Sequence, residues 1–276
     1  MEKVCVVFCE GQHDIAFISR VLRVKGFTAY DKKIREFIPP FDTLFMKLLE
    51  QKQVSDKKLG YSSDYRVPSV SLCRNQERLV LFHNMGGDGK AAQRRELLDL
   101  YRDLKGEDDF TKDLEFQFRF IFVFDADDLG VEHRITEINQ ELGYNDIVKN
   151  GQLVNHDGHE WGAYVFHKEP DGLGDLEDIV LEMVSNTEAN VIINSEGFLH
   201  TNRLPENRTK EFVCTNEDTR YKTASKYKHK KSLLNVAGQL QFSGMSNAVF
   251  IANSDFLSFD ELTNNEHCKR IASLFD

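Results

Sequence analysis

The sequence predicts an α/β fold: a mainly parallel sheet of about four strands flanked by helices, with an inserted hairpin and a helical C-terminal extension. Four apolar runs without polar alternation indicate strands that are buried on both faces, as in a parallel sheet. Each run is followed by a segment with helical periodicity. Strand and helix therefore alternate four times before residue 187, which is typical of a sheet with right-handed crossovers.

The first predicted unit is a strand over residues 3–9 followed by a helix. After Glu10 and Gly11, apolar residues recur with helical spacing until Gly26 ends the pattern. Glu10 therefore lies at the tip of a strand, and Asp14, one turn into the helix, can face the same way. The helix dipole alone also favours an acid here, so Asp14 has a structural explanation beside a functional one.

The second predicted strand, residues 79–82, follows an insertion over about residues 31–77. The insertion has weak periodicity, with one amphipathic helix over residues 43–51 and a polar stretch that indicates a mobile loop. A glycine-rich turn follows the strand and leads to Lys90 and a helix that ends near Leu104. The turn lacks two residues that an ATP-binding P-loop requires, but Lys90 is placed to meet a phosphate group.

The third predicted strand, residues 119–124, ends in three carboxylates. These are Asp125, Asp127 and Asp128, and the helix that follows them is predicted over residues 131–142. Open α/β sheets bind their ligands at the carboxyl ends of the strands. The cluster is therefore a candidate metal site, in which Asp128 is best explained as a helix-start acid.

The fourth unit begins with a predicted hairpin over residues 146–155, whose turn is an Asn-Gly pair at position 150. A strand over residues 161–166 comes next. It leads through a glycine-rich turn to a helix predicted over residues 175–184, with Glu177 in its first turn.

We expect residues 1–186 to form the α/β domain, and residues 187–276 to form an extension that packs on it through helices near 232–240 and 266–275. Residues 203–231 hold nine Lys or Arg against four acids, with aromatic residues between them. This composition is typical of a surface for single-stranded nucleic acid, although a solvated loop has the same composition. The residues expected to contact phosphate groups here are Arg220, Lys222, Lys226, Lys228, Lys230 and Lys231.

The overall composition fits a globular protein with a net charge of −10 and a pI near 5.4. A nucleic-acid contact would therefore need a local basic patch. The first apolar run soon meets acidic residues and is neither a signal peptide nor a membrane span, so we expect a cytoplasmic location. The scattered, odd number of cysteines indicates reduced thiols.

One resemblance gives the three acids of the third strand a covalent role. Residues 124–129 (FDADDL) resemble the nucleophile motif of haloacid-dehalogenase-type phosphatases, in which Asp125 would be the nucleophile. The chain departs from that motif at Asp128 and Leu129, and more than 100 residues precede it. This interpretation also leaves Glu10 without a role, so it is the alternative.

A second resemblance uses both strand ends. Residues 6–14 (VVFCEGQHD) and 122–127 (FVFDAD) are similar to the two signature motifs of the Toprim domain, an apolar strand ending in Glu-Gly and another ending in Asp-x-Asp. Topoisomerases, bacterial-type primases, OLD-type nucleases and ribosomal-RNA maturases share this domain. The resemblance implies a Rossmann-like sheet and covers about residues 3–185.

The resemblance also implies a metal site. Glu10 matches the family's glutamate, a metal ligand or general acid/base, and Asp125 and Asp127 match the aspartate pair that holds a divalent metal. Asp14 matches a second acid seen in the nuclease branch, and Glu177 lies in a segment similar to one whose glutamate completes a second metal site. The implied cofactor is Mg²⁺ or Mn²⁺, a hard ion that carboxylates from separate strand ends suffice to hold.

We therefore expect a small stand-alone Toprim protein, nearest to OLD-type nucleases, that cleaves or transfers phosphodiesters on DNA or RNA, alone or with a protein partner. The expected catalytic residues are Glu10, Asp125 and Asp127. No zinc ribbon or tyrosine-bearing strand-passage domain is recognisable, which argues against topoisomerase and primase activity. The alternatives are a non-catalytic nucleic-acid or nucleotide-binding regulatory module, and the phosphatase with Asp125 as nucleophile.

Overall fold

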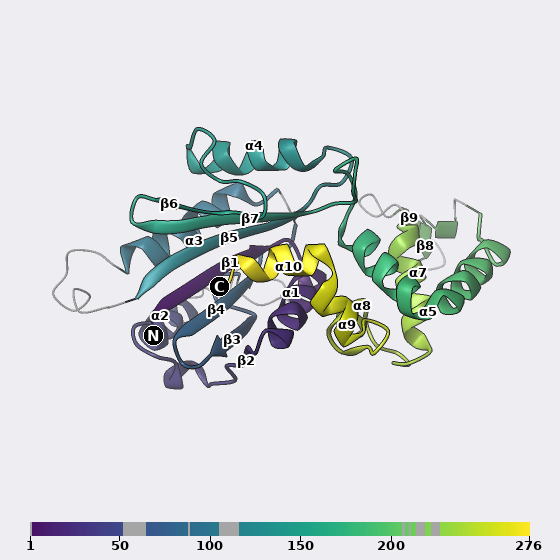
Figure 1. Cartoon of the computed structure of the whole chain (residues 1–276), viewed down its shortest axis with the longest axis horizontal. Helices are drawn as coiled ribbons and strands as arrows, with labels where there is room; N and C mark the ends of the chain where they lie inside the picture. Colours follow the sequence, from purple (N-terminus) through teal and green to yellow (C-terminus); the bar gives the residue numbers. More distant parts are fainter. Residues whose placement is uncertain are drawn as a thin grey trace.

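The computed structural model describes residues 2–51, 65–87, 89–104, 116–205, 208–209, 211–213, 219–221 and 227–276. In these residues seven strands form one sheet in the order β2-β3-β4-β1-β5-β7-β6, and β8 pairs separately with β9. Helices flank the sheet on both faces (Figure 1), so the predicted α/β class is confirmed. The strands are β1 (Lys3–Cys9), β2 (Thr28–Ala29), β3 (Val70–Arg74), β4 (Arg78–Asn84), β5 (Gln117–Asp125), β6 (Leu153–His156), β7 (His159–Phe166), β8 (Glu211–Val213) and β9 (Thr219–Tyr221). The helices are α1 (Gln12–Val24), η1 (Ile34–Glu36), α2 (Phe41–Glu50), α3 (Ala91–Asp103), α4 (Val131–Leu142), α5 (Leu176–Thr201), α7 (His229–Gln239), α8 (Asn247–Asn253), α9 (Phe259–Asn264) and α10 (Glu266–Ser273).

Four strands at the centre of the sheet, β4, β1, β5 and β7, run parallel to one another. They are the strands that the four apolar runs predict. The prediction of about four strands for the whole sheet is wrong, because β2, β3 and β6 add antiparallel strands at the edges. The side chains of β2 are exposed and those of β3 and β6 are mostly half-buried, so these strands lack the continuous apolar run of a central strand.

The hairpin predicted over residues 146–155 is wrong, because the hairpin of the sheet lies later in the chain, over residues 153–166. Strands β6 and β7 are joined at Asp157 and Gly158, whose φ angles are 50° and 74°. Two consecutive positive φ angles define the type I′ turn, which Asp-Gly favours as strongly as Asn-Gly. The Asn-Gly pair precedes β6, where Asn150 forms an isolated parallel bridge with Ala163 of β7.

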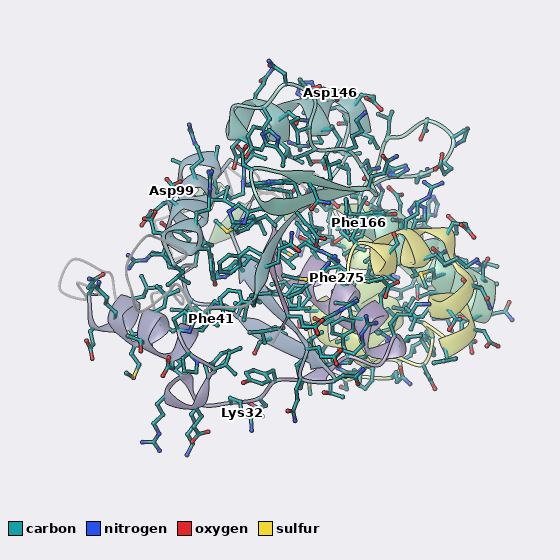
Figure 2. All side chains as sticks on the ribbon, turned by 60° about the vertical axis from the view of Figure 1, so that its left-hand side comes forward. Lys32, Phe41, Asp99, Asp146, Phe166 and Phe275 are labelled. Atoms are coloured by element: carbon teal, nitrogen blue, oxygen red, sulfur yellow. The ribbon has the colours of Figure 1, made fainter. Side chains whose placement is uncertain are left out.

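Successive side chains of the central strands point to opposite faces of the sheet, and each face has its own apolar core. One core joins the sheet to α1, α8, α9, α10 and the first part of α5, and the other joins it to α2, α3 and α4. Strand β1 contributes to both, for example with Val7 in the first core and Phe8 in the second. Figure 2 labels Phe166 and Phe275 of the first core and Phe41 of the second. Burial on both faces explains why the central runs are apolar throughout.

The order of the chain reverses at β1. Strand β4 lies on one side of β1 and β5 on the other, with α1 packed in one core and α3 and α4 in the opposite one. Right-handed crossovers in both directions require this distribution of helices. The reversal places the ligand-binding edge of such a sheet at the carboxyl ends of β1 and β5.

Helix α5 is longer than the predicted helix over residues 175–184. It runs from Leu176 to Thr201 and contains a kink at Glu188, whose φ and ψ are −134° and 52°. Helices α5 and α7 extend beyond the end of the sheet at which β1 and β5 finish (Figure 1). Helices α8, α9 and α10 instead pack on α1 and complete the first core, while the domain boundary near residue 187 stays a prediction.

The predicted reduced thiols are found where the structure describes cysteines. Cys5, Cys9 and Cys268 are buried and free, and Cys73 is free and half-buried. Within the described ranges, none of the helices combines the length and the apolar content that crossing a lipid bilayer requires. Residues 52–64, which hold most of the predicted mobile loop, lie outside the described part of the chain.

Candidate functional site

Glu10 and Asp125 meet at the carboxyl ends of two neighbouring parallel strands. The register pairs Cys9 of β1 with Val123 of β5. Glu10, the residue after Cys9, therefore lies at the same edge of the sheet as Asp125, the last residue of β5. The backbone N–H of Asp125 donates to Glu10 Oε1 at 3.1 Å. The Glu10 carboxylate therefore contacts the backbone of Asp125, 115 residues away in sequence.

Asp125 lies in an environment that disfavours its charge. Burial is the main cause that raises the pKa of Asp125 to about 9, and the negative charges of Asp14, Glu10 and Glu177 raise it further. Its Oδ1 accepts the N–H of Leu176 at the start of α5, at 2.9 Å, which acts in the opposite direction. At neutral pH the metal-free carboxyl group is accordingly protonated.

Asp14 is a buried acid on the first turn of α1. Its Oδ2 accepts the backbone N–H of Gly11 at 2.8 Å, which satisfies one free donor at the start of the helix. Burial raises the pKa of Asp14 to about 6, the Gly11 hydrogen bond opposes this, and the charge of Glu177 adds to it. The helix-start role and the electrostatic link to the cluster therefore coexist.

Glu177 lies in the first turn of α5 and is 2% exposed. Its Oε1 contacts His13 Nδ1 at 2.9 Å and Lys231 Nζ at 3.3 Å. Burial would raise the pKa of Glu177, but the contacts with His13 and Lys231 outweigh it and hold the pKa below its usual value. Three segments far apart in sequence, α1, α5 and α7, thus converge on one carboxylate.

Asp127 stands apart from the other acids. Its φ of 49° is left-handed, and its backbone pairs with Gly174 through two hydrogen bonds of 2.7 and 2.9 Å. Arg134 of α4 donates from Nη2 to Asp127 Oδ2 at 3.0 Å and from Nε to the carbonyl oxygen of Asp125 at 3.0 Å. Arg134 therefore fixes the loop and compensates Asp127, a role for which the sequence offers only the position of this arginine one helical turn into α4.

The predicted acids thus form one cluster of four, Glu10, Asp14, Asp125 and Glu177, with Asp127 held beside it by Arg134. In the described part of the chain, no group of three or more His, Cys, Asp or Glu side chains is arranged as a ready metal site. The donor chemistry nevertheless fits Mg²⁺, which prefers carboxylate oxygens and keeps several of its waters. A bound cation would oppose both causes that raise the pKa of Asp125, its burial and the charges of the neighbouring acids.

A pocket of about 300 Å³ adjoins the cluster and has charges of both signs. It is lined by Asp127, Asp128, Gly174, Asp175, Lys228, His229, Lys230 and Lys231. Lys230 Nζ contacts Asp175 Oδ1 at 3.1 Å and Asp178 Oδ2 at 2.5 Å, which ties the start of α7 to the start of α5. His229 Nε2 lies 2.7 Å from Glu196 Oε2. Lys228 is the exposed residue just before α7.

The remaining predicted phosphate contacts are placed as follows. Lys90 lies at the start of α3, on the same sheet edge as Glu10, whose carbonyl oxygen accepts the N–H of Gly87 at 2.9 Å. Lys222 and Lys226 lie outside the described residues. Arg220 lies on β9, and the structure describes its backbone pairing with Phe212 but not its side chain.

Gly174 allows the close contact between the Asp127 loop and the start of α5. Its φ is +108°, and a Cβ at this position would lie 2.5 Å from Asp178 Oδ2. We predict that Gly174→Ala lowers the free energy of unfolding by more than about 1 kcal/mol, because both the backbone and the Asp178 side chain must shift. Urea denaturation measures this loss.

Gly197→Ala is the matched control for that substitution. Gly197 is an exposed residue of α5, and a Cβ there meets nothing within 4 Å. We expect this variant to be as stable as the original chain or more stable, by up to about 1 kcal/mol, because alanine favours a helix. Equal losses in both variants would mean that the Gly174 backbone is not under the constraint described.

A search against protein-family models, curated proteins and solved structures found no match. The α/β sheet with its parallel centre is compatible with a Rossmann-like fold. The Toprim assignment remains a prediction from the two sequence motifs.

Proposed function

We propose that the chain is a Mg²⁺- or Mn²⁺-dependent enzyme of Toprim type that cleaves phosphodiester bonds in nucleic acid. One observation supports this most directly: the Glu10 carboxylate contacts the backbone of Asp125 at the ends of adjacent parallel strands, and the charges of Asp14, Glu10 and Glu177 all act on the Asp125 carboxyl group. Buried acids that repel one another in the metal-free chain are stabilised when a cation binds and displaces the proton.

Three of the acids are the metal ligands in this proposal. Glu10, Asp125 and Asp127 would hold the metal ion, and Arg134 keeps the Asp127 carboxylate beside the other two. A bound divalent ion supplies an activated water and charge compensation for the phosphodiester.

The substrate class follows from the charges around the acid cluster. The chain carries a net charge of −10, so a polyanion needs a local basic surface. The pocket beside Asp127 provides Lys228, Lys230 and Lys231 at its rim. A phosphate backbone bound in this pocket would lie against Asp127, which Arg134 holds next to Asp125, and this is consistent with DNA or RNA as the substrate.

A non-catalytic binding module is the second candidate, and two ion pairs favour it. Asp127 is paired with Arg134 and Glu177 with Lys231, so two of the five predicted acids are neutralised by the protein itself. A module of this kind would bind nucleic acid or nucleotides through the lysines. Such a module would bind its ligand while the ion pairs of Asp127 with Arg134 and of Glu177 with Lys231 stay intact.

The phosphatase alternative gives no role to Glu10, although the Glu10 side chain accepts the backbone N–H of Asp125. This alternative predicts turnover of a small phosphate ester that persists in Glu10→Gln.

The test is a panel of end-labelled single- and double-stranded DNA and RNA, incubated with Mn²⁺, with Mg²⁺ or with EDTA. We expect cleavage of at least one substrate with metal and none with EDTA. Glu10→Gln should abolish it, while Asp99→Asn, an exposed acid on α3 (Figure 2), should cleave normally. Binding without metal-dependent cleavage would support the module, and unchanged cleavage in Glu10→Gln would refute the assigned site.

A further inference from the structure

Another pocket lies between α3 and α4, on the face of the sheet that these helices cover. Strand β1 lies between β4 and β5, but the helix that follows it, α1, packs in the core of the opposite face. This arrangement leaves room between α3 and α4 near the carboxyl ends of β4 and β5, where a pocket of about 380 Å³ is found. Open α/β sheets bind ligands at such places, and the volume suits one small ligand.

Two buried arginines give this pocket fixed walls. Arg94 and Arg134 are 4% and 6% exposed. Arg94 Nη2 donates to Glu141 Oε2 at 2.7 Å, and Arg134 Nη1 donates to Glu137 Oε2 at 3.0 Å. Both glutamates also line the pocket. These ion pairs hold the walls in place, and because their charges largely cancel, they do not by themselves select an anion or a cation.

Arg95 adds a positive charge that the two ion pairs do not offset. Its side chain lines the pocket and is exposed, and among the residues that the structure describes no acid pairs with it. Lys90, which the sequence predicts to meet a phosphate group, lies between the lining residues Gly89 and Ala91. The mouth of the pocket therefore attracts an anion.

The pocket also offers a surface for a flat, apolar group. Phe124 and Ile138 line it, and the guanidinium carbon of Arg94 lies 4.8 Å from the centre of the Phe124 ring. Nucleobases stack on aromatic rings and on guanidinium planes, and arginine binds phosphate groups. A nucleoside monophosphate combines a flat base with an anionic phosphate, so it is the ligand class that uses both parts of the pocket.

We infer that the pocket between α3 and α4 binds a nucleoside monophosphate, with the phosphate group at Arg95 and the base against Phe124 and Ile138. This inference goes beyond the proposed function, because none of the four clustered acids lines the pocket and binding there needs neither a metal ion nor cleavage. A free nucleotide and the 5′-terminal nucleotide of a strand present the same chemical groups, and the experiment distinguishes these two sources.

The test is isothermal titration calorimetry of the full chain with adenosine, guanosine, cytidine and uridine 5′-monophosphates, in the presence of EDTA. We expect at least one of them to bind at a single site, more tightly than inorganic phosphate or the nucleoside without phosphate. Arg95→Met should weaken this binding about tenfold, the effect of losing one charge-assisted hydrogen bond. Arg102→Met removes an exposed arginine of the same helix outside the pocket, and it should leave the affinity unchanged.

Further measurements separate the source of the ligand and the two sites. Competition by a single-stranded oligonucleotide with a 5′-phosphate, but not with a 5′-hydroxyl group, would assign the pocket to strand ends, and no competition would assign it to free nucleotides. Glu10→Gln should bind the nucleotide normally, so a failure of the cleavage proposal leaves this result intact. Absence of nucleotide binding, or equal affinity in folded Arg95→Met, would overturn the inference. Circular dichroism melting shows that the variants are folded.

Discussion

Asp125→Asn is expected to lose metal-dependent cleavage by on the order of 10³-fold, which corresponds to about 4 kcal/mol of transition-state stabilisation. Asparagine keeps the size of the side chain and its acceptor for the N–H of Leu176, but it supplies no charge to a metal ion. Mn²⁺ should raise the melting temperature of the original chain and should not raise that of the variant. Gel assays of cleavage and calorimetric melting with and without Mn²⁺ measure the two effects.

The same substitution is expected to stabilise the metal-free protein. The pKa of Asp125 is about 9 in the folded chain and lies near 3.8 when the group is unperturbed. Between these values the unfolded chain has released a proton that the folded chain retains, so the stability of the original protein falls as the pH rises from about 4 to about 9. Asparagine does not titrate and removes this loss.

The stabilisation by Asp125→Asn should therefore depend on pH. At pH 8 we expect a gain of about 0.5–2 kcal/mol, or a few degrees in melting temperature, as is common when a functional acid is neutralised. The gain should shrink towards pH 4, where the original side chain is protonated in both states. A gain of the same size at pH 4 and pH 8 would contradict the ionisation argument, and Asp99→Asn should show no gain at either pH.

The central strands were predictable because burial on both faces of the sheet gives them an uninterrupted apolar sequence. Strand β1 and helix α4 match their predicted bounds, since an apolar run and a helical period each have a clear start and end. The edge strands β2, β3 and β6 were not predictable in this way, because short and half-exposed strands depend on pairing with a neighbour. The hairpin turn was misplaced because the sequence contains two suitable turns, and pairing with β7 selected the later one.

The sequence was sufficient to predict which acids lie at the site, but not which basic residues pair with them. Parallel strands end at one edge, which is why Glu10 and Asp125 could be placed together from sequence. The contacts of Arg134 with Asp127 and of Lys231 with Glu177 depend on how α4 and α7 pack. No local pattern encodes that packing.

Arg119→Met is expected to lower the free energy of unfolding by about 3–5 kcal/mol, because it leaves a largely buried carboxylate without its main partner. Arg119 lies on β5 at the end of the sheet opposite the acid cluster, and it is 2% exposed. Its Nε donates to Glu160 Oε2 at 2.6 Å, and its Nη1 and Nη2 donate to the carbonyl oxygens of Leu274 and Asp276 at 2.6 and 3.0 Å. One side chain thus joins β5, β7 and the residues after α10.

Two further variants separate the ion pair from the backbone contacts. Lys3 also contacts Glu160, at 2.8 Å, but it is 28% exposed, so Lys3→Met should cost no more than about 1 kcal/mol. The double variant Arg119→Met with Glu160→Gln removes the carboxylate that has lost its main partner and keeps only Lys3, and should recover part of the loss. If it recovers nothing, the loss comes from the carbonyl contacts of Leu274 and Asp276.

Cleavage by the folded fraction of Arg119→Met should stay unchanged, because the substitution acts at the far end of β5 and leaves Glu10 and Asp125 in contact.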